Sequence, residues 1–230
     1  MTTGARAGEA VCERIDRLIE ESSLLKHPFY QAWQRGALSL EALQGYARQY
    51  SHFIRALPTY VSGTHANCDD PSERRQLLEN LVEEEGGEEN LLELWLRFGE
   101  AVGARREEVL GAEPLPETGE LVRTYRGITK EGPFVRGIAA LYAYEAQIPG
   151  VAATKLDGLK RFYGIDGGRG VEHFERHGTL DVKHSAFARE MVAKYATGLE
   201  AEEAAVSAAD EASRALWGFL DGVHGAYVAA

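Results

Sequence analysis

The sequence predicts an all-α protein, a single domain of about seven or eight helices. Apolar residues recur at helical spacing along nearly the whole chain, and no segment keeps the period-two alternation of a strand. The connections are too short for a clean domain boundary, and 230 residues suit one domain at ~150 residues each. We therefore expect one helical bundle over residues 1–230.

The first three helices are indicated by apolar stripes and by start signals. Apolar residues are spaced helically over 11–19. The second helix begins after Ser39, which is placed as its cap, and we expect Pro58 to kink it near its end. The third begins at Asp70-Pro71-Ser72-Glu73, a cap followed by a proline and then a glutamate at the third helical position. It breaks or bends at Gly86-Gly87.

The remaining helices are separated by glycine and proline. A fourth ends near Gly103, and the segment 111–119 is the clearest loop because it is rich in both residue types. The later helices are, in order, a fifth ending at Gly132, a sixth from Pro133 to Tyr163 interrupted at Pro149-Gly150, a seventh from about Gly170 to Tyr195 and a last from about Glu200 to Val228.

Composition excludes several classes of partner. The net charge of -11 argues against nucleic acid or an anionic membrane. The longest apolar run, Ile138–Tyr144, is far too short to span a bilayer. The chain opens Met-Thr-Thr-Gly without the apolar core of a signal peptide, and two cysteines form no disulfide framework. We expect a cytoplasmic protein.

One helix carries a candidate metal-binding pattern. His177, Asp181 and His184 are separated by four and three residues, so their side chains share one helix face. Two imidazoles and a carboxylate over two turns can bind a transition metal if other helices supply further carboxylates. The alternative is a pair of exposed histidines beside an aspartate.

Two glutamates are candidates for the missing carboxylates. Glu145 lies in the most apolar helix, and a buried carboxylate is costly unless it is paired, hydrogen-bonded or bound to metal. Its alternative is an ion pair with an arginine. Glu84 follows an apolar Leu-Val pair, but together with Glu83 and Glu85 it also fits a solvated acidic face.

Motifs from about residue 24 to 222 resemble the heme-oxygenase-like oxidases. They are His27-Pro28-Phe29-Tyr30-x-x-Trp33, Tyr46-x-x-Gln49-Tyr50-x-His52-Phe53, Leu81-x-Glu83-Glu84-x-Gly86, Leu94-Trp95, Tyr144-Glu145-x-Gln147-Ile148-Pro149 and His177-x-x-x-Asp181-x-x-His184. The chain is most similar to the subgroup typified by the Chlamydia protein associating with death domains, a relative of pyrroloquinoline quinone synthase C and the TenA proteins. The resemblance implies a heme-oxygenase-like bundle and p-aminobenzoate formation for folate synthesis.

The resemblance also implies roles for individual residues. A dinuclear Fe/Fe or Fe/Mn centre would use O₂ and a reductant. The ring source would be the enzyme's own Tyr30 and the nitrogen donor Lys155, with Tyr46 and Tyr144 near the metals as electron relays. A further family tyrosine aligns with His173, which removes a phenol there. The implied metal ligands are Glu84, Glu145, His177, Asp181 and His184.

One departure from the family pattern affects the metal site. The family's histidine ligand seven residues after the first glutamate falls on Leu91, which has no donor atom. Five ligands remain, and the loss of an imidazole implies weak occupancy or a single metal. Three replacements are open: Glu88 one turn beyond Glu84, a water molecule, or His65 from another helix.

The leading expectation is therefore a non-heme iron oxidase of the p-aminobenzoate synthase type. The alternatives are a metal-impaired scaffold that binds a small molecule or a partner, and an oxidase of an external substrate. A TenA thiaminase is disfavoured because Cys12 and Cys68 match no nucleophile position, and quinone synthase chemistry fits the His177/Asp181 pair less well. We expect a homodimer, from the resemblance and because symmetric dimers are common.

Overall fold

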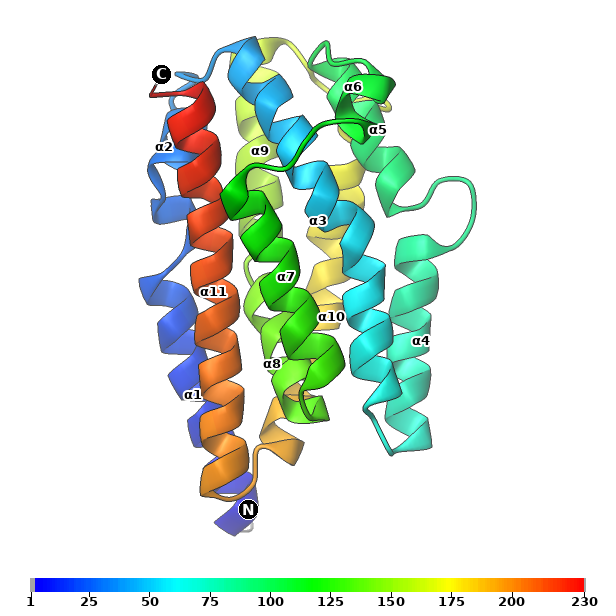
Figure 1. Cartoon of the computed structure of the whole chain (residues 1–230), viewed down its shortest axis with the longest axis vertical. Helices are drawn as coiled ribbons and strands as arrows, with labels where there is room; N and C mark the ends of the chain where they lie inside the picture. The colour runs from blue at the N-terminus through cyan, green and yellow to red at the C-terminus, as the bar shows by residue number, and fades with distance from the viewer. Residues whose placement is uncertain (1–2, 230) are drawn as a thin grey trace.

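The long helices of the chain run nearly parallel to one axis, which makes an elongated bundle (Figure 1). The computed structural model describes residues 3–229, and the first two residues, on which part of the expectation about the chain start rests, lie outside that range. The elements are α1 (Thr3–Glu21), the 3-10 helix η1 (Leu24–Lys26), α2 (Pro28–Gln34), α3 (Leu40–Ala66), α4 (Pro71–Glu85), α5 (Leu91–Ala101), α6 (Arg106–Leu110), α7 (Pro116–Glu131), α8 (Phe134–Glu145), α9 (Ile148–Tyr163), α10 (Glu172–Tyr195) and α11 (Leu199–Tyr227).

The all-α prediction is confirmed for the described residues, which contain no strand. The predicted start signals are in place: the side chains of Ser39 and Asp70 accept hydrogen bonds from the first turns of α3 and α4. Three details differ. Pro58 lies inside α3, which continues to Ala66, and the predicted loop 111–119 is shortened because α7 begins at Pro116. The short helices α2 and α6 were not predicted.

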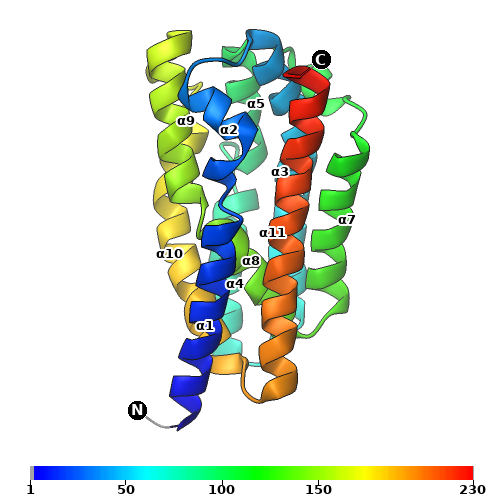
Figure 2. The same ribbon diagram turned by 90° about the vertical axis from the view of Figure 1, so that its left-hand side faces the viewer.

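Helix α8 is the central element of the bundle. It packs against α3, α7, α10 and α11, and all of its residues except Arg136 are buried. Figure 2, the view from the side of α1 and α11, shows α8 behind these two helices. An apolar helix surrounded by others needs small residues where neighbours approach closely. Gly137 provides this, since a Cβ there would lie 2.6 Å from Thr64 Oγ1.

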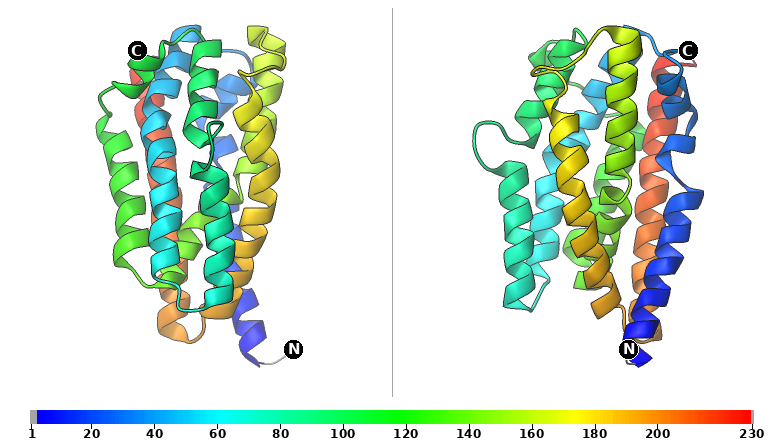
Figure 3. Two further views of the ribbon diagram at one scale, coloured as in Figure 1. Left: turned by 90° about the vertical axis from the view of Figure 1, so that its right-hand side faces the viewer. Right: turned by 180° about the vertical axis from the view of Figure 1, so that it is seen from behind.

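Helices α4 and α5 form one column on the side of the bundle where α10 also lies (Figure 3). The chain leaves α4 at Gly86 and bulges outward before Asn90 caps α5. Gly87 has a φ of +74°, a conformation that favours glycine. This break allows Glu84, at the end of α4, and Leu91, at the start of α5, to line one hollow of about 210 Å³.

The buried apolar side chains form one continuous cluster that draws on helices from both ends of the chain. Aromatic rings dominate the part of this cluster around Trp33, Tyr46 and Trp95. Among the described residues, no helix is both long enough and apolar enough to cross a bilayer.

Candidate metal centre

The five predicted ligand side chains converge in the bundle interior from three helices. Glu84 comes from α4 and Glu145 from α8, and each residue of the set is at most 4% exposed. The remaining three are His177, Asp181 and His184 of α10. The alternative interpretations from sequence are wrong on exposure, because neither the histidine pair nor Glu84 faces solvent.

Local sequence explains why these side chains face the interior. Pro149 disfavours an unbroken helix at this point because its ring would clash with the carbonyl four residues earlier, which belongs to Glu145. Helix α8 therefore ends at Glu145, and α9 begins at Ile148. On α10 the spacing of four and three residues places His177, Asp181 and His184 on one face, as predicted.

The donor atoms lie close enough together to hold one cation between them. One ligand atom each from Glu145, Asp181 and His184 lie within 4.8 Å of one another. Nδ1 of His177 is 3.5 Å from Asp181 Oδ2 and 3.8 Å from Glu84 Oε1. Nδ1 of His184 is 3.8 Å from Asp181 Oδ1 and 4.0 Å from Glu84 Oε1. These distances are longer than a good hydrogen bond, so the donor atoms do not satisfy one another directly. A cation among them would be a shared partner.

Unpartnered polar atoms support the fit to a metal. Glu84 Oε2, His177 Nε2 and His184 Nδ1 are buried without a hydrogen-bond partner among the described residues. Such atoms are rare in folded proteins unless a ligand or water satisfies them. Within residues 7–229, whose side chains the structure describes, neither Glu84 nor Glu145 pairs with an arginine or a lysine, so the arginine-pair alternative is wrong. A set of carboxylates and imidazoles suits iron, manganese or zinc.

The pKa values of candidate ligands in the cluster are raised, which favours their protonated forms. Burial raises the pKa of Glu145 to about 8, and the charges of Asp181 and Glu84 add to this effect. Burial also raises the pKa of Glu84. For His184 the effect of burial, which lowers the pKa, is outweighed by Asp181, Glu145 and Glu83, so its pKa is raised to about 9. A divalent cation would displace these protons and balance the carboxylates.

A second group of buried polar side chains lies among aromatic rings. Lys155 Nζ donates to the Tyr46 hydroxyl at 2.7 Å, and the hydroxyls of Tyr46 and Tyr30 are 3.2 Å apart. All three residues are buried. Burial lowers the pKa of Lys155 to about 7. Near neutral pH a large fraction of this amine is therefore uncharged and nucleophilic.

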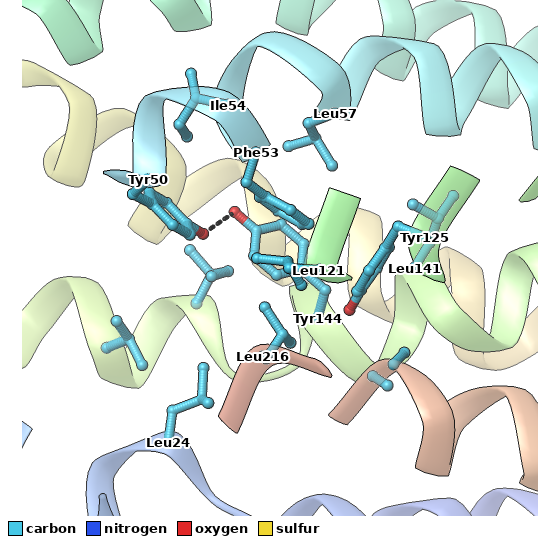
Figure 4. Packing of buried hydrophobic residues seen from close by; sticks show 14 of the residues in the cluster. Leu24, Tyr50, Phe53, Ile54, Leu57, Leu121, Tyr125, Leu141, Tyr144 and Leu216 are labelled. Atoms are coloured by element: carbon cyan, nitrogen blue, oxygen red, sulfur yellow. Dashed lines mark hydrogen bonds between the residues drawn. The ribbon is translucent and has the colours of Figure 1, made fainter. Parts of the chain in front are cut away.

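Tyr50 connects this group to the donor cluster. Its ring stacks on Tyr46 with centroids 5.4 Å apart, and its hydroxyl donates to the Tyr144 hydroxyl at 3.0 Å (Figure 4). Tyr144 precedes Glu145 in α8, so the line of phenols ends next to a candidate ligand. Burial raises the pKa of all four tyrosines, Tyr30, Tyr46, Tyr50 and Tyr144, which keeps them protonated.

Comparison with known proteins assigns the family. The model of the TENA/THI-4/PQQC family matches residues 15–221. The chain belongs to the TENA/THI-4/PQQC family. It is 41% identical over 226 residues to a protein of Nitrosomonas europaea named 4-aminobenzoate synthase, an alignment that covers 94% of this chain and 92% of the relative. It is 39% identical over 208 residues to the 4-aminobenzoate synthase of Chlamydia pneumoniae, with 90% and 92% covered.

Similar solved structures confirm the fold. A CADD-like protein of unknown function from Nostoc punctiforme superposes with a TM-score of 0.79 at 17% identity, covering 97% of this chain and 99% of that one. A domain of unknown function with a heme oxygenase-like fold, from Shewanella denitrificans, gives 0.76 at 19% identity, with 99% and 94% covered. The predicted heme-oxygenase-like bundle is thereby confirmed.

The departures from the family pattern have defined places in the structure. Leu91 is buried beside Glu84 and offers no donor. Of the three predicted replacements, neither side chain lies with the ligands: Glu88 is exposed in the connection between α4 and α5, and His65 lies in the last turn of α3, before α4 begins at Pro71. Replacement by a water molecule stays a prediction. His173 is buried between Trp95 and His177, with ring centroids 4.9 Å from each. It occupies the interior but carries no phenol.

Sequence reasoning missed three polar contacts. Asn80 Nδ2 donates to Glu145 Oε1 at 3.3 Å, Glu83 Oε2 accepts from His184 Nε2 at 2.6 Å, and Tyr50 joins the phenol line. Asn80 had a detectable signal, since it lies one helical turn before Glu84. Glu83 had none, because its contact depends on how α4 packs beside α10. The thiols of Cys12 and Cys68 are buried and free, and neither belongs to the donor cluster.

Proposed function

We propose that this chain is a 4-aminobenzoate synthase of the self-sacrificing type, a non-heme metal-dependent oxidase that uses O₂ and a reductant. The ring of Tyr30 would become the product ring: its Cα–Cβ bond would break, Cβ would be oxidised to the carboxylate with O₂ as the electron acceptor, and the hydroxyl would leave as water. Lys155 would supply the nitrogen that replaces this hydroxyl, with cleavage of its own Cε–Nζ bond. The names of relatives at 35–41% identity support the product. The internal arrangement of Tyr30, Lys155 and the donor cluster supports the route.

The chemistry of the product matches what these two side chains offer. 4-Aminobenzoate is an aromatic ring with a carboxylate and an amine opposite one another. A tyrosine ring already carries a carbon substituent, Cβ, opposite its hydroxyl. Lys155 Nζ is 5.6 Å from the centre of the Tyr30 ring, so donor and acceptor lie close together in the bundle interior. A free amine is needed for attack, and burial provides it by lowering the pKa of Lys155.

The donor cluster would supply the oxidising power. Glu84, Glu145, His177, Asp181 and His184 would hold an iron pair, an iron and a manganese, or a single iron, and the bound metal would supply O₂ activation. The protein's other contribution is to keep the oxidation inside the bundle. Tyr30 and Tyr46 are at most 2% exposed, so water is excluded from the reacting ring.

A line of four tyrosines, called the phenol line, would give electrons a path between the donor cluster and Tyr30. Tyr144, Tyr50, Tyr46 and Tyr30 are joined by two hydroxyl–hydroxyl contacts and one ring stack. Each hydroxyl in a contact has a partner oxygen that can take or give a proton as an electron moves. Tyr50 therefore joins the predicted relays Tyr46 and Tyr144 in this proposal.

The observation that carries the proposal is the contact between Lys155, Tyr46 and Tyr30 at the end of that line. The test is aerobic incubation of iron-loaded protein with reductant, after growth on ring-¹³C tyrosine and ¹⁵N lysine. Mass spectrometry should find 4-aminobenzoate carrying both labels and a protein altered at Tyr30. Equal product from Tyr30→Phe would rule out self-sacrifice.

Leu91 favours a second candidate function, a scaffold that binds a small molecule or partner without turnover. A leucine beside Glu84 leaves one metal position short of an imidazole. Metal content well below one per chain would support this alternative, and content near two would exclude it. The homodimer stays a prediction, for which light scattering during gel filtration is the test.

A further inference from the structure

Two adjacent glutamates of α4 face the two nitrogens of one imidazole. His184 Nε2 lies 2.6 Å from Glu83 Oε2, and its Nδ1 lies 4.0 Å from Glu84 Oε1. Successive residues on a helix point about 100° apart, so Glu84 reaches into the donor cluster while Glu83 reaches the outer edge of the ring. The side chain of Glu83 is 29% exposed, compared with 4% for His184.

This geometry settles which nitrogen of His184 faces the cluster. A carboxylate accepts hydrogen bonds and cannot donate them, so the short contact to Glu83 requires a proton on Nε2. In the neutral ring the lone pair is then on Nδ1. That atom is buried, has no hydrogen-bond partner among the described residues, and lies 3.8 Å from Asp181 Oδ1. Nδ1 is therefore the atom available to a cation.

We propose that Glu83 is a positioning residue of the metal centre, which fixes the tautomer and the ring orientation of His184 so that Nδ1 binds the metal. The inference rests on the metal centre of the proposed function. A carboxylate that holds the distal nitrogen of a metal-binding histidine also makes that ligand more basic. Glu83 would thus strengthen metal binding without touching the metal.

The surroundings of Glu83 hold its carboxylate in place. Arg176 Nη2 donates to the Glu83 backbone oxygen at 3.1 Å, and Arg176 Nη1 donates to the Glu89 backbone oxygen at 2.9 Å. Lys183 Nζ lies 3.7 Å from Glu83 Oε1, the oxygen that does not face His184. One arginine therefore fixes the end of α4 against α10, and each carboxylate oxygen has its own neighbour.

A simple link between α4 and α10 is the competing explanation of the Glu83–His184 contact. Such a link would stabilise the fold, but it would not depend on the other nitrogen of the ring. A positioning role predicts an effect on metal affinity in a protein that remains folded. The test must therefore measure metal binding separately from stability.

The experiment compares Co²⁺ binding by the wild type with binding by Glu83→Ala and Glu83→Gln, using the visible absorption of the bound ion. We expect the dissociation constant of Glu83→Ala to rise by about 10- to 100-fold. Glu83→Gln keeps an acceptor oxygen without the charge, and should be intermediate. Glu85→Ala, at an exposed residue of the same helical turn that does not contact His184, is the matched control and should bind as the wild type does. Circular dichroism of the metal-free variants checks the fold.

A second readout reports the ring proton directly. In Co²⁺-loaded wild type, proton NMR should show a shifted, slowly exchanging N–H signal from His184, which His184→Gln removes. Glu83→Ala should lose this signal or exchange it faster with water. Unchanged affinity and an unchanged signal in folded Glu83→Ala would overturn the role of Glu83 but leave the metal centre in place. Failure of the wild type to bind Co²⁺ would overturn it together with the metal centre.

Discussion

We predict that the buried Lys155 lowers the free energy of unfolding at neutral pH. Its replacement by methionine should raise the free energy of unfolding. The ammonium group is buried among aromatic rings without an acidic partner among the described residues. Methionine has a similar length and no charge, so Lys155→Met removes the penalty without opening a large cavity. Stability should rise although the proposed amine donor is lost.

The size of the effect follows from the pKa. Burial lowers the pKa of Lys155 from 10.5 to about 7, and at ~1.36 kcal/mol per unit this corresponds to about 5 kcal/mol. The variant also loses the hydrogen bond to Tyr46, which contributes about 1 kcal/mol, and cation–π contacts worth about 1 kcal/mol. The expected net gain is therefore about 3 kcal/mol at pH 7 and below.

The pH dependence provides the sharper check. Between pH 7 and 10.5 the unfolded wild-type chain binds more protons at this lysine than the folded chain, so wild-type stability rises with pH in that range. The advantage of Lys155→Met should shrink accordingly as the pH approaches 10.5.

Urea unfolding of the metal-free proteins at several pH values measures this difference in the free energy of unfolding. Lys160→Met, at an exposed lysine paired with Asp166 at 3.0 Å, is the matched control and should show no gain. A Lys155→Met protein less stable than the wild type, or a difference independent of pH, would refute the reasoning.

Three further predictions follow. Gly158→Ala would place a Cβ 2.4 Å from Trp33 Cδ1, so we expect a loss of about 1–3 kcal/mol in urea unfolding, and a loss below 0.5 kcal/mol would contradict this packing. Leu91→His would add an imidazole beside Glu84, so elemental analysis should find more metal per chain than in the wild type. Metal affinity should rise with pH up to about 9, because binding must displace protons from Glu145 and His184, and a flat profile in calorimetric titrations would argue against these ligands.

The helices could be predicted from sequence where periodicity and caps agree. Asp70 and Ser39 mark the starts of α4 and α3 because their side chains cap the first turn. The short helix Arg106–Leu110 escaped prediction because five residues do not establish a period. Pro116 was assigned to a loop, yet proline suits the first helical turn, where its missing N–H costs nothing.

In the candidate site, too, residues that share one helix could be grouped from sequence, whereas contacts between helices could not. His177, Asp181 and His184 could be grouped from sequence alone because one helix carries all three. Glu145 and Glu84 lie on other helices. Their sequence surroundings made them candidates, but an alternative stayed open for each until the family resemblance implied both as ligands. Glu83 was not predicted at all, since its contact with His184 depends on the packing of α4 beside α10, which no local pattern encodes.

The measurement that tests the central claim most directly is the metal content of the folded protein after anaerobic loading with Fe²⁺ and Mn²⁺ and removal of loosely bound ions. The five buried donors predict at least one metal per chain in the wild type, and far less in Glu145→Ala, which takes a carboxylate from the cluster. A folded wild-type protein that retains well below one metal per chain would contradict the account.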